Sequence, residues 1–375
     1  MTLNPIVLSI PIYFVLIVLE WSWDLYTGKK HYTFEDALGN IGCGLTQQLT
    51  NLLSKVGVVA LYTWIYSEYR FFDIEHTWYG AFVLFVLIDF CYYWAHRLSH
   101  EVNLFWVGHV VHHQSEEYNF SVALRQGTFQ TFFTSPFYWP LALLGFDPYW
   151  FLYIGAFVTL YQFWIHTEYI KKMGWFEFVF NTPSHHRVHH ATDAQYIDKN
   201  HGGTLIIWDR MFGTFIMENE APTYGITNPL NSFNPVYATL HPVVSLWKRF
   251  VQTPGVNNKL QVLFRSPAWK YENEIETTDV TAKPSTNGAT KKVRIYTGIW
   301  FLLVIGLAAN LLFNYQNYDL SFNVFYVFGL LFSLWSIGNL NDGLAYAKKV
   351  EVLRSMLVVG VLLWFLWQSN LSGLI

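Results

Sequence analysis

Nine of the fourteen histidines in this chain lie in two short stretches, and their spacing limits how the chain can fold. The first stretch has an HxxxH pair followed by an HxxHH group, and the second has another HxxHH group preceded by one more histidine. A spacing of three or four residues returns a side chain to the same face of an α-helix. The pattern therefore predicts three helical faces, formed by His96 and His100, by His109, His112 and His113, and by His186, His189 and His190, with His185 beside the last.

Clusters of this density favour metal binding. An isolated histidine is usually a surface residue or a satisfied core residue. Many imidazoles packed together repel one another when protonated, whereas a metal ion uses their lone pairs directly. Imidazole suits Zn, Fe, Cu and Ni, and eight ligands are too many for one ion. We therefore predict a dinuclear site held by His96, His100, His109, His112, His113, His186, His189 and His190.

The composition is that of a membrane protein. Of 375 residues, 53% are hydrophobic and only 13% are charged, against a charged share of about 25% in soluble domains. The net charge of -3 gives no reason to expect a nucleic-acid partner. Apolar stretches that suit membrane-spanning helices predict an all-α bundle of about eight spans, near residues 5–23, 41–66, 78–95, 128–146, 148–166, 296–314, 321–340 and 354–373.

Two of these spans are weaker than the rest. Polar residues interrupt 41–66, and Pro136 and Pro140 interrupt 128–146, so either stretch is a candidate for a kinked or re-entrant segment. With the N-terminus outside, only Arg70 of the 23 Lys and Arg residues falls outside and only Lys55 within a span. The same orientation puts every histidine cluster on the cytoplasmic side.

The chain divides into four parts on this basis. Residues 1–166 hold membrane helices and the first histidine clusters, and residues 167–271, called the cap below, form a cytoplasmic segment with the last cluster. Residues 272–295 are polar without apolar periodicity and read as a flexible linker. Residues 296–375 hold C-terminal membrane helices without histidine, which we expect to serve packing.

The order of the three clusters, poor in carboxylates and flanked by spans, resembles the fatty acid hydroxylase and sterol desaturase superfamily. Several runs around the clusters resemble its alkylglycerol monooxygenase branch more closely. These runs are Ser115–Asn119 with Ala123–Gln126, Phe163–Glu168, Asn181–His190 and Leu205–Phe215. The likeness covers residues 5–250 and is strongest from 89 to 215.

The resemblance implies a membrane di-iron monooxygenase that uses dioxygen and an external electron donor, with tetrahydrobiopterin as the donor in the alkylglycerol branch. Its substrate would be a membrane lipid, most simply an alkylglycerol ether, in a bacterial inner membrane or the endoplasmic reticulum. A sterol or fatty-acyl hydroxylase or desaturase on the same scaffold is the first alternative, and a non-catalytic zinc-binding membrane protein is the second.

Three more residues are candidate ligands or supports for ligands. The superfamily places an HxxxH pair before its last cluster, but here His166 is followed four residues later by Ile170. Glu168 could supply an oxygen ligand or accept a hydrogen bond from a ligand, and a solvated helix-end carboxylate is an equal interpretation. His185 is either a ligand or a donor to one. The isolated His31, His76, His201 and His241 are expected to be incidental.

The first prediction concerns the ligands. His112→Ala or His189→Ala should remove bound metal and activity, because neighbouring histidines are already committed as ligands. His76→Ala is the control and should change neither. Metal analysis and turnover of the purified variants decide the matter; full metal content in the His112 variant would contradict the assignment.

The second prediction concerns orientation. Reversing the chain in the membrane would put about twenty basic residues on the wrong side. A cysteine at Ser285 should therefore react with an impermeant thiol reagent only after the membrane is permeabilised. Labelling in intact cells would show that the orientation is the opposite one.

Overall fold

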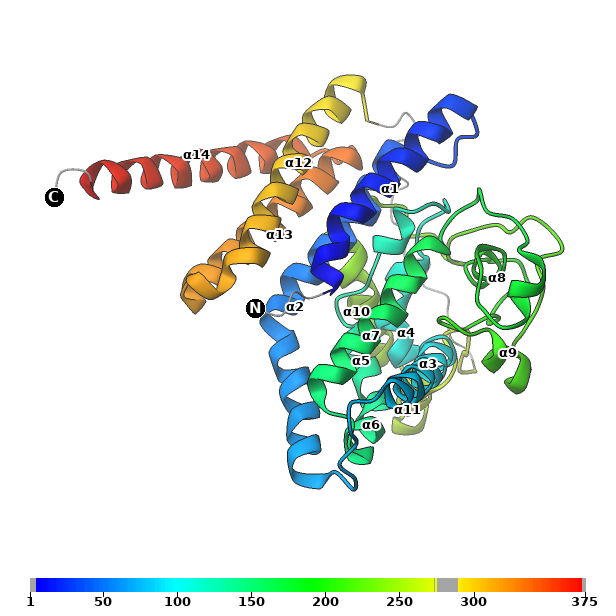
Figure 1. Cartoon of the computed structure of the whole chain (residues 1–375). Helices are drawn as coiled ribbons and strands as arrows, with labels where there is room; N and C mark the ends of the chain where they lie inside the picture. The colour runs from blue at the N-terminus through cyan, green and yellow to red at the C-terminus, as the bar shows by residue number, and fades with distance from the viewer. Residues whose placement is uncertain (1–4, 273, 275–288, 373–375) are drawn as a thin grey trace.

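The computed structural model describes residues 5–272, 274 and 289–372 (Figure 1). Their regular structure is helical, apart from two isolated β-bridges, Phe180–Leu205 and Ala191–Tyr224. The α-helices are α1 (Pro5–Thr27), α2 (Phe34–Tyr69), α3 (Trp78–Glu101), α4 (Asn103–His113), α5 (Gln130–Thr134), α6 (Trp139–Leu144), α7 (Pro148–Trp164), α8 (Pro183–His189), α9 (Ile207–Phe212), α10 (Pro235–Gln252), α11 (Val256–Phe264), α12 (Lys291–Asn314), α13 (Leu320–Asn341) and α14 (Ala347–Ser372). Short 3-10 helices are η1 (Val122–Leu124), η2 (Ser135–Tyr138), η3 (Gly174–Phe178) and η4 (Tyr315–Asn317).

Four helical stretches in the described part of the chain are long and apolar enough to cross a membrane. They are Ser9–Thr27, Trp78–Glu101, Lys291–Asn317 and Leu320–Asn341. Each coincides with a span expected from the sequence. The predicted all-helical membrane architecture is therefore confirmed. Among the described residues, four of the eight predicted spans coincide with helices long and apolar enough to cross a membrane.

The stretch at 128–146 differs from a continuous span. It is divided into α5, η2 and α6, with Pro136 in η2 and Pro140 in the first turn of α6. Proline lacks a backbone N–H and clashes with the preceding turn, so it begins new helices here. The chain at 41–66 lies instead within one unbroken 36-residue helix, α2. α7 has 17 residues, about 26 Å at 1.5 Å per residue.

The predicted C-terminal boundary of the linker, residue 295, differs from the structure, because α12 already begins at Lys291. Thr290 caps that helix by accepting a hydrogen bond from the Val293 amide. Most of the remaining linker, including Ser285, lies outside the described residues.

Two apolar cores lie along α2. Near its start, Leu38 and Ile41 pack with Phe301 of α12 and Leu334 of α13. Near its end, Tyr62 packs in a second core that contains Leu84 of α3, together with residues of α6 and α7. The histidine-free helices α12 and α13 thus pack against α2, on the opposite side of the molecule from α8 and α9 (Figure 1).

A tight junction between α3 and α4 positions the first histidine clusters. α3 ends at Glu101, and α4 begins two residues later at Asn103. The Asn103 amide donates to the Arg265 carbonyl at 2.9 Å, and its side-chain amide donates to the Val262 carbonyl at 2.9 Å. These bonds fix the start of α4 against the end of α11, so that α4 packs against α3.

Candidate metal centre

The histidines of the clusters come from three helices and one helix end. α3 supplies His96 and His100 in its last turns, and α4 supplies its histidines in its last two turns. α8 is a short helix with Pro183 in its first turn, and its cluster extends to the C-cap residue, His190. His166 follows the end of α7. All of these side chains are buried.

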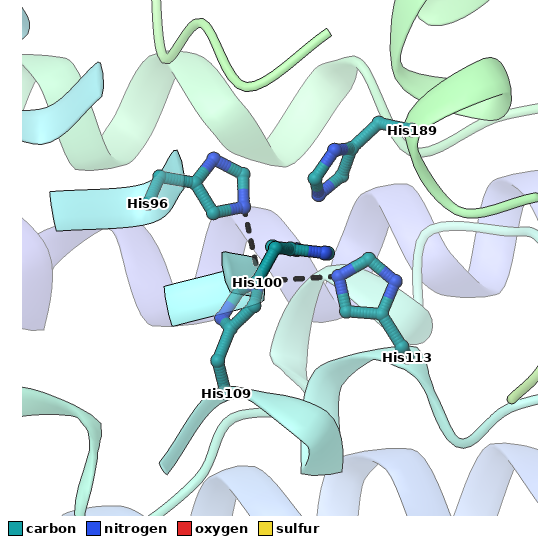
Figure 2. Close-up of side chains that lie close together, drawn as sticks. All are labelled: His96, His100, His109, His113 and His189. Atoms are coloured by element: carbon teal, nitrogen blue, oxygen red, sulfur yellow. Dashed lines mark hydrogen bonds between the residues drawn. The ribbon is translucent and has the colours of Figure 1, made fainter. Parts of the chain in front are cut away.

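The imidazoles form two groups, within each of which one nitrogen per residue lies within 4.8 Å of the others. The first group contains His96, His100, His109, His113 and His189, and the second contains His112, His166, His186 and His190. Figure 2 shows the five rings of the first group converging on one point from α3, α4 and α8. Two separate groups fit the expectation of two ions.

Each HxxHH cluster is split between the groups. In α4, His109 and His113 point to the first group, while His112 points to the second. In α8, His186 and His190 point to the second group, while His189 points to the first. Residues four apart lie almost in line along a helix, whereas the intervening residue is rotated away by about 100° per step. α4 and α8 therefore lie between the groups and contribute to both.

Backbone carbonyls fix the protonation of four imidazoles. The Nδ1–H groups of His96, His112, His166 and His189 donate to the carbonyls of His201, Arg125, Gln162 and Lys199, at 2.8, 2.8, 2.7 and 2.9 Å. A carbonyl only accepts, so the proton must be on Nδ1, and a neutral ring then has a lone pair on Nε2.

The lone pairs in the second group face one another. The Nε2 atoms of His112 and His166 are 3.2 Å apart, and neither carries a proton that could join them. This contact is repulsive unless a cation lies between the two atoms. The residues present therefore fit a metal ion better than they fit a packed apolar core.

The distances in the second group also fit a metal. Four Nε2–Nε2 separations are 3.0 Å for His166–His186, 3.1 Å for His112–His190, and 3.2 Å for both His112–His166 and His186–His190. A tetrahedral ion with metal–nitrogen bonds of about 2.0–2.1 Å would have nitrogen–nitrogen edges of about 3.3–3.4 Å. The donor set is entirely nitrogen, which suits borderline transition metals.

Burial keeps these imidazoles neutral. Removal from water lowers the pKa of His112 to about 4, and it lowers the pKa of His109, His113, His189 and His190 well below 6.5. Neighbouring imidazoles lower these pKa values further. The lone pairs are therefore available for metal binding at neutral pH.

Of the three further candidate residues, His166, Glu168 and His185, only His166 belongs to one of the two groups. The structure places His166 in the second group. Glu168 lies outside both groups, where it accepts a hydrogen bond from the Tyr224 hydroxyl and one from Lys171 at 3.2 Å. His185 is also outside both groups and faces the ring of Phe215.

His201, which the sequence analysis expects to be incidental, lies beside the first group but belongs to neither group. Its ring is fully buried, with its centroid 5.1 Å from that of His100 and 5.5 Å from that of His189. Its carbonyl accepts the Nδ1–H of His96. His76, by contrast, pairs with Asp147 at the start of α7.

Two buried carboxylates hold the loop of His201 in place, and no sequence pattern predicts this arrangement. Asp209 accepts from the amides of His201 and Gly202, both at 2.7 Å. Asp89 of α3 accepts from the amides of Thr204 and Leu205 at 2.7 and 3.0 Å. These bonds fasten to α3 the loop whose carbonyl orients His96.

Gly203 allows this loop to approach α3. A Cβ atom at Gly203 would lie 2.7 Å from the ring of Tyr92 and 3.0 Å from the Asp89 carboxylate. Any larger residue would push the loop away from α3 and with it the carbonyl that orients His96. The close approach therefore requires glycine.

Comparison with known proteins identifies the family. Residues 81–214, which contain both groups, match the fatty acid hydroxylase family model. An alkylglycerol monooxygenase of Homo sapiens is 39% identical over 360 residues, covering 92% of this chain and 80% of the relative. Those of Xenopus tropicalis and Danio rerio are 36% and 37% identical, covering 92% of this chain and 79% and 78% of the relatives. The chain belongs to the fatty acid hydroxylase family.

The resemblance inferred from the histidine clusters is thereby confirmed. This fatty acid hydroxylase family member is an oxidoreductase, a monooxygenase whose reaction requires a lipid and dioxygen. The alternative of a non-catalytic zinc-binding protein is set aside by these relatives. No solved structure is significantly similar to the chain.

The third prediction concerns the pH dependence of the metal-free protein. A histidine whose pKa is lower in the folded state stabilises the fold fully above pH 6.5, and this contribution is lost as the pH falls. For His112 the window runs from pH 6.5 to about 4, equivalent to about 3 kcal/mol. The melting temperature should therefore fall steeply from pH 7 to pH 4.5.

Buried carboxyls act in the opposite direction, since burial raises the pKa of Asp209 to about 6. The His112→Asn variant isolates the histidine contribution, and its melting temperature should fall less over the same range. Equal slopes for the two proteins would contradict the pKa assignment of His112.

Proposed function

We propose that this monooxygenase is a di-iron enzyme that cleaves the ether bond of alkylglycerol lipids. The observation that carries the proposal is the pair of buried imidazole groups in a chain 39% identical to an alkylglycerol monooxygenase over 92% of its length. The eight predicted ligands and His166 are assigned to the ions as the groups divide them, with five residues for the first and four for the second.

Iron with dioxygen would supply the power to oxidise an unactivated C–H bond, which no side chain supplies. The chain itself contributes orientation and shielding. Carbonyls hold the Nδ1 protons of His96, His112, His166 and His189 so that each Nε2 lone pair points inward. Burial of all nine rings excludes bulk water from the site.

The proposed reaction follows from bond chemistry. The chain carbon beside the ether oxygen has a weaker C–H bond than the rest of the chain. Insertion of one oxygen atom there gives a hemiacetal, and two electrons and two protons reduce the other oxygen atom to water. The hemiacetal then breaks its C–O bond unaided, giving a fatty aldehyde and a free glycerol hydroxyl. No protein nucleophile is needed for this step.

The electron donor we propose is a reduced pterin, tetrahydrobiopterin, as the resemblance to the alkylglycerol branch implies. It would act as an external two-electron reductant that binds from the water-exposed side. A redox protein is the alternative donor, and the two are distinguished by adding each separately to purified enzyme.

We also propose the placement of the chain in the membrane. Besides the four membrane-spanning candidates, α2, α7 and α14 would cross, and the broken α5–α6 segment would make the remaining crossing as a kinked span, giving the eight expected spans. The Phe71 amide donates to the Leu143 carbonyl at 2.7 Å, which supports α6 ending on the same side as the α2–α3 connection. Residues 1–166 and 296–375 would form the membrane part, and the cap would face the cytoplasm. The distribution of basic residues supports this orientation.

The fourth prediction tests the reaction. Membranes containing the protein, given a labelled alkylglycerol, dioxygen and reduced pterin, should release labelled fatty aldehyde. His113→Ala should abolish the release, because it removes a ligand of the first group, while His76→Ala should not. Hydroxylation of a sterol or acyl chain, with no aldehyde under any reductant, would refute the ether-lipid proposal and favour the alternative enzyme.

A further inference from the structure

Arg187 is a buried cation in the middle of the last histidine cluster. Its side chain is 0% exposed, and it lies on α8 directly after His186. A guanidinium is always charged, so its presence in a segment that supplies ligands to two cations opposes metal binding electrostatically. A buried charge of this kind needs a full set of partners.

Four hydrogen bonds hold the Arg187 guanidinium, and a second carboxylate, Glu168, lies 3.9 Å from its Nε. Its Nε and Nη2 donate to the two carboxylate oxygens of Glu218, at 2.8 and 2.6 Å. Its Nη1 donates to the carbonyls of Thr167 and Ile170, at 2.9 and 2.8 Å. The bidentate pair neutralises the charge and fixes the plane of the guanidinium.

These partners belong to the segments that supply the second group. Thr167 directly follows His166, so Arg187 ties the backbone after His166 to the helix that carries His186 and His190. The remaining member, His112, is oriented separately through the Arg125 carbonyl. Three of the four second-group imidazoles thus depend on the segments that Arg187 joins.

The segment of Glu218 is itself held in place. The amides of Asn219 and Glu220 donate to the hydroxyl of Tyr196, at 3.0 and 2.8 Å. Tyr196 is buried and packs with Val188 of α8. Glu218 therefore meets Arg187 from a fixed position.

The positions of the first-group imidazoles do not depend on the Arg187–Glu218 pair. Four of its five imidazoles come from α3 and α4. The fifth, His189, shares α8 with Arg187 but is oriented by the Lys199 carbonyl. Loss of the pair should therefore affect the two groups unequally.

We infer that Arg187 and Glu218 are a positioning pair for the second metal, and that without the pair this metal is lost while the first is retained. The inference rests on the proposed two-metal function. Loss of a group that orients metal ligands typically lowers metal affinity about 10–100-fold. That is the change expected for the second ion.

The experiment uses the full-length protein in detergent, loaded with iron and titrated with a chelator. Arg187→Lys keeps a positive charge but cannot make the four bonds. Glu218→Gln removes the bidentate countercharge with little change in shape and leaves Glu168, 3.9 Å from Nε, as the remaining carboxylate. The wild type should hold two irons per chain with high affinity. Both variants should release one iron at a chelator concentration about 10–100-fold lower, and keep the other iron at the wild-type value.

A matched control is available on α10. Arg249 donates from Nε and Nη2 to the two oxygens of Glu274, at 2.6 and 3.0 Å, and from Nη2 to the Trp269 carbonyl. This pair has the same bidentate chemistry, and none of its three bonds is made to a segment that supplies either group. α10 itself packs against α4, so the variant also tests whether a general loosening near α4 releases metal. Arg249→Lys should leave both irons at wild-type affinity.

The Mössbauer spectrum of the retained iron gives a second readout, and it should match that of the iron left in His190→Ala, which lacks a second-group ligand. Two irons at wild-type affinity in both Arg187→Lys and Glu218→Gln would overturn the positioning role. So would loss of both irons together in the two variants. If Arg187→Lys does not fold, Glu218→Gln alone decides; fewer than two irons in the wild type would instead contradict the proposed function.

Discussion

Mutual repulsion among nine buried imidazoles is the constraint on which the rest of the structure depends. Four of the rings have their Nδ1 protons committed to backbone carbonyls, so their Nε2 lone pairs point inward. Without a cation, burying these groups together costs free energy. Metal binding and the packing of α3, α4 and α8 would therefore be coupled, because ions that neutralise the lone pairs would also hold the three helices together.

The surrounding protein supplies the rigidity that this arrangement needs. The two apolar cores along α2 anchor the helices that carry or flank the histidines. Closer to the site, hydrogen bonds between polar groups hold the structure. Asp89 and Asp209 fix the loop of His201. The Arg125 carbonyl accepts a hydrogen bond from His112. Arg125 also donates from its guanidinium to the Val111 carbonyl, to Asn40 and to Gln114, which fixes the end of α4.

Sequence reasoning brought the clustered histidines together because helical spacing is a local property. The positions of His109 and His113, four residues apart, were enough to predict a shared face. The division of each cluster between two groups was out of reach, because it depends on how α4 and α8 pack against other helices. The same holds for His201, which is isolated in sequence and meets its neighbours only through the loop folded onto α3. Composition predicted a membrane protein, but it could not say how Pro136 and Pro140 would divide their stretch.

α3 combines two features that bear on which bond of a lipid would be accessible. It is one of the membrane-spanning candidates, and His96 and His100 lie in its last turns. If α3 spans the bilayer, the depth of the reactive centre is determined by the position of these histidines along the helix. A lipid held at the interface by its headgroup would then present the same carbon atoms at that depth, whatever the length of its tail.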